Sequence, residues 1–375
     1  MLTGELIDHA DAVAPHAAAW DALAAENRLP YCTPAWMLGW WTHARPAGGR
    51  LRVAVALDGG ALAGVAPCYA VRERGVEHLR MLASPTAHRA QPVSVRGRER
   101  EVVGVLAGAL AAARPRAGVL AFAGVPEGSP WPALLAAGWP GSLRAGRRLV
   151  ERVPAPLLSL SGKTYEEWFA SRSKNFRSQM RRAQRSLEEQ GARVRMAATP
   201  AEIDQDVRAF IRLHHARWDP RGGSEAIDEG VERMLRATAT ELVGTGNLRL
   251  AAVVAGEQTV AVQAMVAAGG EVSYWLGGFD EAWSRSKPAL VALLAAVEDA
   301  FERQDDRLDL GAGVQEYKLR FADGQEVLEW SSVVPRGVRA PLDWALLAPS
   351  RARSALGRAT YERRASLRRR LRKGT

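Results

Sequence analysis

Residues 271–330 read EVSYWLGGFDEAWSRSKPALVALLAAVEDAFERQDDRLDLGAGVQEYKLRFADGQEVLEW, and they alternate short apolar runs with helical patterns. The apolar runs at 272–276 and 308–310 predict two strands. Between them, Pro288 suits the first turn of a helix because its missing N–H has no partner there, and Ser286 is the predicted cap. A strand that leads through a loop into a helix start presents backbone N–H groups, which suits a phosphate. This segment is therefore the predicted reactive part of the protein.

The composition is that of a two-domain globular protein. The 375 residues are enough for two domains with separate cores, and 47% of them are hydrophobic and 25% charged. The two cysteines, Cys32 and Cys68, have no metal or redox spacing. Together with the absence of a leader sequence and of any apolar run of membrane-spanning length, they lead us to expect a cytoplasmic protein.

The net charge of +10 is concentrated at the C-terminal end. Residues 351–375 contain ten Arg or Lys and one acid, so this tail carries +9 and the rest of the chain about +1. Such a tail is either a solvated end or a contact for nucleic acid or an anionic membrane surface. The nearly neutral body argues against nucleic acid as a general partner.

One order of elements occurs twice along the chain: two helices, three strands, helix, strand, helix, strand. In the first half we expect them at 11–25, 34–43, 51–57, 61–71, 76–82, 101–113, 119–125, 131–138 and 143–153. In the second half we expect them at 201–218, 228–243, 248–255, 259–267, 271–277, from 288, 307–310, 313–321 and 326–334. A Pro-rich break at 154–156 and one polar helix at 165–189 separate the halves. The repeat predicts a duplicated α/β (α+β) domain with a mixed, mainly antiparallel sheet flanked by helices.

This element order resembles the GNAT acyltransferase fold. The tandem pair resembles the acetyltransferases associated with cellulose biosynthesis (CelD/BcsL-like, also called BioF2-like). The resemblance covers roughly residues 20–335 and rests on Tyr31, Pro34 and Trp36, KNFRSQMRRAQRSL at 174–187, Arg217-Trp218, YWLGGFD at 274–280, and LDLGAGVQEYKLRF at 308–321. The same tandem architecture occurs in FemABX-like transferases, which use charged tRNA as the donor.

The resemblance implies four regions. These are a non-catalytic N-terminal GNAT-like domain at 1–155 that completes the acceptor cleft, a basic linking helix at 156–192, a catalytic GNAT-like domain at 193–336, and the basic tail at 337–375.

The resemblance also predicts where an acyl-CoA would bind. In GNAT enzymes the pyrophosphate of the CoA lies where the fourth strand runs into the next helix, which matches residues 277–290 here. The predicted cofactor-binding residues are Ser284, Arg285, Ser286, Lys287 and Ala289. The usual Q/R-x-x-G-x-G/A signature is replaced by a loop without glycine, so Arg285 and Lys287 are expected to supply charge to the pyrophosphate. No metal is expected because no His, Cys or Asp cluster has ligand spacing.

Tyr317 is the predicted general acid. It lies eight residues after Asp309, in a position that resembles the tyrosine protonating the departing CoA thiolate in many GNAT enzymes. The general base stays open among His214 or its neighbour His215, Glu271 at the start of a strand, and Asp280 at its end.

The acceptor-binding residues are predicted on three elements: Arg217 and Trp218 at the end of a helix, Trp275 on the strand before the loop, and Lys318 beside Tyr317. Another feature is a basic stripe on the polar helix, formed by Lys174, Arg177, Arg181 and Arg185. The stripe is either a solvated face or a contact for a phosphate-rich ligand. The apolar residues of the same helix predict that it packs between or across the domains.

The sequence thus predicts a tandem GNAT-like N-acyltransferase. It would move an acyl group, acetyl in the first instance, from acyl-CoA to a primary amine of a small molecule or sugar. One alternative is FemABX-like aminoacyl transfer from charged tRNA. A second is a catalytically inactive GNAT-like binding module.

Overall fold

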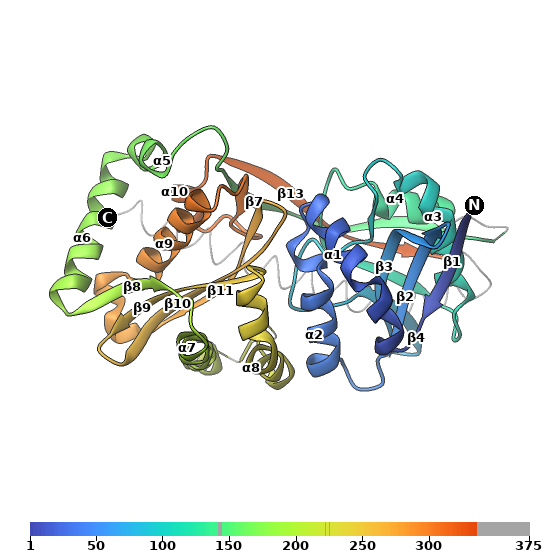
Figure 1. The fold of residues 1–375 in the computed structure, drawn as a ribbon, viewed down its shortest axis with the longest axis horizontal. Coiled ribbons are helices and arrows are strands. Elements are labelled where there is room, and N and C mark those ends of the chain that lie inside the picture. The colour runs from blue at the N-terminus through green and yellow to red at the C-terminus, as the bar shows by residue number, and fades with distance from the viewer. Residues whose placement is uncertain (142–144, 222, 225, 336–375) are drawn as a thin grey trace, which may run out of the picture.

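The computed structural model describes residues 1–141, 145–221, 223–224 and 226–335. They form two halves with the same order of elements, drawn at the two ends of the ribbon in Figure 1. The first half contains β1 (Leu2–Ile7), η1 (Ala10–His16), α1 (Ala17–Glu26), η2 (Pro30–Cys32), α2 (Pro34–Ala44), β2 (Arg50–Asp58), β3 (Ala61–Glu73), β4 (Val76–Met81), β5 (Val93–Ser94), α3 (Glu99–Ala112), β6 (Val119–Pro126), α4 (Trp131–Gly138) and β7 (Gly146–Ser159).

The second half begins with a pair of helices and one strand, α5 (Tyr165–Ser171), α6 (Lys174–Glu189) and β8 (Ala192–Met196). It continues with α7 (Pro200–Trp218), η3 (Asp219–Arg221), α8 (Glu229–Gly244), β9 (Leu248–Ala255), β10 (Gln258–Ala268), β11 (Glu271–Phe279), η4 (Glu281–Ser286), α9 (Pro288–Glu302), β12 (Arg307–Asp309), α10 (Glu316–Phe321) and β13 (Gly324–Val334). The predicted basic tail lies outside the described residues.

The strands of the described residues join in one mixed sheet. Their order is β1-β2-β3-β4-β6-β13-β7-β12-β11-β10-β9-β8, with β5 beside β3. Each half supplies one parallel pair, β4 with β6 and β11 with β12, because a helix crosses over between the paired strands. The other pairs are antiparallel. The predicted fold class is confirmed.

The last strand of each half is exchanged with the other half. β13 pairs with β6 of the first half, β7 pairs with β12 of the second half, and β7 and β13 pair with each other. Figure 1 shows both strands at the junction of the two halves. Backbone hydrogen bonds therefore join the halves, and the domain limit predicted at residue 155 falls within β7. The predicted domain limits stay predictions.

Two hydrophobic cores lie on opposite faces of the second half's sheet, as the alternation along β9 and β10 requires. One core continues from the helices α7 and α8 into the first half, where Trp36 of α2 lies edge-on to Trp275 of β11 at a centroid distance of 5.0 Å. The other core lies under α5, α6 and α9 around the fully buried Trp168 and Phe321. In the described part of the chain, no helix is long and apolar enough to cross a membrane.

The structure corrects the predicted break between the halves. Pro154 and Pro156 lie inside β7, where their carbonyl oxygens accept hydrogen bonds from the N–H groups of Gly313 (2.8 Å) and Leu310 (3.0 Å). Proline lacks only the donor, so a strand can contain it where the ladder needs an acceptor. The short strands β1, β5 and β8 were not predicted at all.

The single helix predicted at 165–189 is also wrong, because Thr164 and Ser173 each cap a separate helix start. The second of these helices, α6, buries Phe176, Met180 and Leu187 as its apolar spacing predicts. It packs against β8, η4 and α9 rather than between the domains, and Figure 1 places it at the end remote from the first half. Its apolar face is covered within the second half, so no face remains for the first half.

Candidate active site

The strands β11 and β12 separate at one end and leave an open edge. Their pairing runs from Glu271 and Arg307 only as far as Ser273 and Asp309, where β12 ends. β11 continues to Phe279 with β10 on its other side. Among the described residues no strand pairs with β11 on the β12 side beyond Ser273, so the backbone there is available to an extended ligand.

A cavity of about 1020 Å³ lies beside this edge. Its walls come from the end of α7, β10, β11, η4, the start of α9, the loop after β12, and α10. The first half supplies Tyr31, Pro85, Thr86 and His88. Both halves therefore contribute to one concave site, as a cleft for two substrates requires.

The start of α9 opens into this cavity without a side-chain cap. Lys287 precedes the helix in the left-handed conformation, with φ of 53°, and the first turn carries no acidic residue. Ser284, Lys287 and Ala289 line the cavity. The uncapped, acid-free helix start favours a negatively charged ligand.

Two of the five predicted cofactor-binding residues lie elsewhere. Ser286 is not the helix cap that was predicted, because its hydroxyl is buried against α6, 3.2 Å from that of Ser186 and 2.8 Å from Nε2 of Gln190. These hydrogen bonds hold η4 against α6, so the hydroxyl of Ser286 is not directed at a ligand. Arg285 lies outside the residues that line the cavity.

Gly277 shows how closely β11 is packed beside the cavity. A Cβ atom at this position would lie 1.8 Å from Oε1 of Gln263, so any other residue would displace the Gln263 side chain. Gln263 in turn donates from Nε2 to the carbonyl of Ala289 at 2.8 Å. Gly277 thus allows β10 to hold the first turn of α9 against the edge of β11.

Tyr317 and Tyr274 form a hydrogen-bonded pair in the cavity wall. Burial raises the pKa of both phenols, and their hydrogen bond raises the pKa of Tyr274 further but lowers that of Tyr317.

A buried ion pair fixes the end of β12. Asp309 is 2% exposed and accepts hydrogen bonds from Nε of Arg89 (2.7 Å) and from the N–H of Gly311 (2.9 Å). Burial alone would raise the pKa of Asp309, but Arg89 and the Gly311 N–H hold it below its usual value. Arg89, from the first half, also pairs with Glu326 of β13. The pairs join three segments at the floor of the cavity.

Lys318 lies beside the tyrosine pair and is almost completely buried. Its Nζ donates to the carbonyl oxygens of Gly311 (3.3 Å) and Ala312 (2.9 Å), and it lies 5.9 Å from the ring centroid of Tyr274. Burial lowers its pKa to about 8, although Asp309 opposes this. Its contacts hold the loop after β12, and no ion pair joins it to Asp309 among the described residues.

The residues predicted as general base do not line the cavity. Glu271 is 1% exposed and its Oε2 accepts from Nε of Arg307 at 2.7 Å, and burial raises its pKa to about 6. His214 is 2% exposed in the core, where burial lowers its pKa to about 4. His215 lies between Asp219 and Glu232. Asp280 caps η4 by accepting from the N–H of Ala282 at 3.0 Å.

The predicted acceptor-binding residues are brought together. Arg217, Trp218, Trp275 and Lys318 all line the cavity. The guanidinium of Arg217 lies 5.1 Å from the ring centroid of Phe279, and Nε1 of Trp275 donates to the carbonyl of Thr86 at 2.7 Å.

Sequence reasoning missed His88, Tyr31, Tyr274 and Gln263 as cavity residues. The signal for His88 was the loop at 84–98, which is rich in Pro, His and Arg. A simple connection from a strand to a helix does not need such a loop. Tyr274 is the first residue of the YWLGGFD run, and it lies just beyond the last residue of β11 that pairs with β12.

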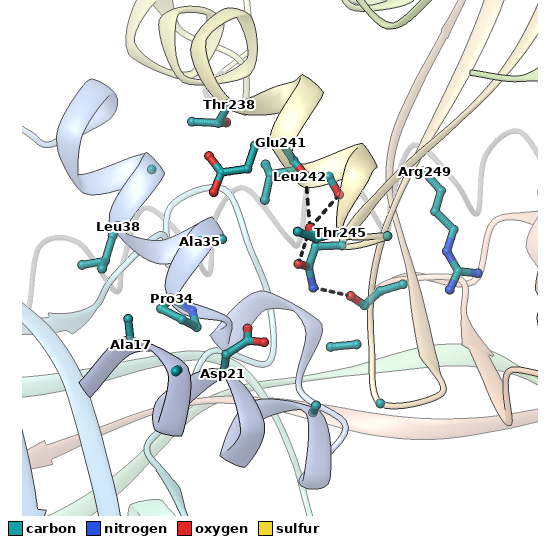
Figure 2. A pocket seen from close by; sticks show the side chains of 18 of the residues that line it. Ala17, Asp21, Pro34, Ala35, Leu38, Thr238, Glu241, Leu242, Thr245 and Arg249 are labelled. Atoms are coloured by element: carbon teal, nitrogen blue, oxygen red, sulfur yellow. Dashed lines mark hydrogen bonds between the residues drawn. The ribbon is translucent and has the colours of Figure 1, made fainter. Parts of the chain in front are cut away.

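A second groove of about 980 Å³ lies between α1 and α2 of the first half and α8 of the second (Figure 2). Ala and Gly residues make up much of its wall, and Asp21 and Glu241 lie on opposite sides of it. Arg249, at its edge, is paired with Asp305 in the loop before β12. The groove contains none of the predicted site residues.

Comparisons with known proteins agree with this geometry. Residues 174–319 match the family model described as the acetyltransferase (GNAT) domain. The structure of FemX superposes with a TM-score of 0.60 at 11% identity, covering 85% of this chain and 94% of that one. A conserved protein of unknown function from Bacteroides thetaiotaomicron superposes with a TM-score of 0.54 at 12% identity, covering 88% and 99%. No curated protein matches the sequence.

The matched domain defines a class: residues 174–319 are a GNAT acetyltransferase domain, the kind of domain found in GNAT-type N-acyltransferases. Within that class its two-half architecture is FemABX-like, which the likeness to FemX shows at the level of the fold. The CelD/BcsL-like branch expected from the sequence motifs stays a prediction.

Proposed function

We propose that the protein transfers an acyl group, acetyl in the first instance, from acyl-CoA to a primary amine of a small molecule or sugar. The observation that carries this proposal is the start of α9. An uncapped helix start with no acid in its first turn opens beside the free edge of β11. An acyl-CoA has the matching parts, a pyrophosphate for the helix start and an amide-containing arm for the strand edge.

Lys287, Ser284 and the N–H of Ala289 are the groups proposed to hold the pyrophosphate. Arg285, outside the cavity wall, is not needed for this contact. The edge of β11 directs the thioester toward Tyr274 and Tyr317, which lie beyond the last paired residue. Tyr317 is proposed as the general acid that protonates the leaving thiolate.

The acceptor is proposed to enter from the side of α7 and the first half. Arg217, Trp218 and Trp275 line this side, and Tyr31 and His88 complete it from the first half. The aromatic surface suits a small organic amine or a sugar ring. We place the reaction in the cytoplasm, which the two free, buried cysteines support.

A second candidate donor is a charged tRNA, used in FemABX fashion. The observation that favours it is α6, where Lys174, Arg181, Arg182 and Arg185 are exposed. Among the described residues these four cations form no ion pair with a carboxylate. α6 touches η4, which leads into the start of α9, through Ser186 and Ser286.

The test is a thermal-shift titration with acetyl-CoA, CoA and charged tRNA, followed by thiol release from acetyl-CoA in the presence of amines. Stabilisation by CoA and amine-dependent thiol release are the expected results. Stabilisation by charged tRNA alone would move the proposal to the second donor. A protein that responds to none of the three would be an inactive binding module and would overturn both proposals.

A further inference from the structure

Transfer to an amine requires a base. An amine in water near neutral pH carries an extra proton, and the nitrogen has no lone pair for attack until this proton leaves. None of the four residues predicted as the base, His214, His215, Glu271 and Asp280, lines the cavity. The base must therefore be another group that lines the cavity, or a water held by one.

Most titratable groups of the cavity wall are already committed. Asp309 is held by Arg89 and the N–H of Gly311, which lower its pKa. Nζ of Lys318 donates to two carbonyl oxygens and is a proton donor there. The buried phenols of Tyr31 and Tyr274 have raised pKa values, so they keep their protons at neutral pH.

His88 is the remaining group with a nitrogen lone pair at neutral pH. The residue is exposed at the wall of the cavity, and its ring lies edge-on to Trp330 of β13 at a centroid distance of 5.2 Å. Partial desolvation by the surrounding protein atoms lowers the pKa of His88 below its ordinary value. Asp309 opposes this effect, while Arg89 and Lys318 add to it. Within the part of the chain that the structure describes, these three are the charged groups that shift the pKa of the ring.

The loop that carries His88 is fixed on both sides of it. Before it, the carbonyl of Thr86 accepts from Nε1 of Trp275 at 2.7 Å. After it, the N–H of Arg89 donates to the carbonyl of Gly124 at 2.9 Å, and the side chain of Arg89 pairs with Asp309 and Glu326. Contacts to β6, β11, β12 and β13 thus hold one histidine of the first half in the wall of the second half's cavity.

We propose that His88 is the general base of the reaction, supplied by the first half to the site that the second half builds. The inference rests on the proposed acyl transfer. The imidazole takes one proton from the bound ammonium, and the nitrogen lone pair forms the new C–N bond with the thioester carbon. The C–S bond breaks, and its electron pair leaves on sulfur. Tyr317 gives its proton to that sulfur and regains one from the attacking nitrogen, while His88 releases its proton to water.

The test compares His88→Gln with His43→Gln in the full chain, using acetyl-CoA and the best amine acceptor. His43 lies in the wall of the second groove and not in the cavity, so its variant controls for loss of a histidine. For the wild type we expect kcat/KM for the amine to fall as the pH drops below the lowered pKa of His88. For His88→Gln we expect a loss of about 10²-fold or more, no such acid limb, and unchanged affinity for CoA.

A His88→Ala variant with added imidazole separates chemistry from folding, because free imidazole can replace the missing base but cannot restore a fold. Partial rescue supports the proposal. A His88→Gln variant that keeps the wild-type rate or the wild-type acid limb would overturn it. If the wild type itself releases no thiol with any amine, the proposed function fails, and this inference fails with it.

Discussion

The same strand–loop–helix unit has a different role in each of the two halves. In the first half, β4 ends at Met81, directly after its last pairing with β6 at Arg80, and does not run on as a free edge. In the second half, β11 runs six residues beyond its last pairing with β12. The short strand leaves no open edge in the first half, whereas the long one lines a cavity.

The starts of the helices that follow these strands, α3 and α9, also differ in charge. The first turn of α3 carries Glu99 and Glu101, and Glu99 accepts from the N–H of Gly97 at 3.1 Å. The first turn of α9 has no acid and is preceded by Lys287. Carboxylates at a helix start occupy the position that a phosphate would take and repel it. The start of α9 is therefore open to the proposed anion, whereas acidic side chains of its own half occupy the start of α3.

The loop after β4 takes on a different task. It carries Arg89 and His88 across to the second half, where Arg89 pairs with Asp309. The first half thus supplies side chains to the cavity that the second half builds. The element order sets the scaffold, and a few side chains at one loop distinguish the copy that we propose to be reactive.

The largest effect is expected where the halves are joined. Arg89→Met leaves the buried Asp309 without its cation, and we expect the free energy of unfolding to fall by about 3–5 kcal/mol. The matched variant Arg80→Met breaks a half-exposed pair with Glu73 inside the first half and should cost about 1 kcal/mol or less. Denaturant unfolding measures both, and equal losses would contradict the special role of the junction.

Tyr317→Phe should lower kcat by about 10²–10³-fold while CoA binding stays unchanged, because the phenol donates a proton only in the reaction. Tyr69→Phe in the first half removes a buried phenol outside the cavity and should leave kcat as it is. Steady-state kinetics with calorimetric CoA binding distinguishes them. A wild-type kcat in Tyr317→Phe removes this residue from the mechanism.

Much of the fold could be predicted from the sequence, because the signals involved are local. The periodicity of apolar residues and Pro288 predict where α9 begins, and the order of elements predicts the tandem fold. The features that could not be predicted from the sequence depend on burial and on contacts between residues far apart in the chain. Glu271 and His214 are polar residues on the predicted elements, but only tertiary packing shows that both are buried away from the cavity. His88 reaches the site because Arg89 pairs with a residue 220 positions away.

The difference in stability between the wild type and a Glu271→Gln variant should depend on pH. Glu271 has a folded pKa of about 6, which lies above its unfolded value, so its contribution to stability is complete below about pH 4.5 and is lost as the pH rises through 6. Glu271→Gln should therefore gain about 2 kcal/mol relative to the wild type between pH 4 and pH 7. Urea unfolding at several pH values measures this gain, and a difference that is independent of pH would contradict the buried carboxylate's role.

The smallest effect is expected at the helix start of α9. Lys287 has a φ of 53°, a conformation that glycine adopts without strain, so Lys287→Gly should gain up to about 1 kcal/mol of stability. The same variant loses the charge at the proposed phosphate site and should bind CoA a few-fold more weakly. Thermal unfolding and CoA titration, done together, separate the two effects. Tighter CoA binding would show that the backbone matters more than the charge.

The comparison of the two halves is tested most directly by calorimetric titration of the full chain with acetyl-CoA. The α9 site predicts one molecule bound per chain, with affinity lowered by Lys287→Glu and unchanged by Arg98→Glu at the start of α3. Two molecules per chain, or equal losses in the two variants, would contradict the claim that only the second half keeps the anion site. No binding at all would contradict acyl-CoA as the donor.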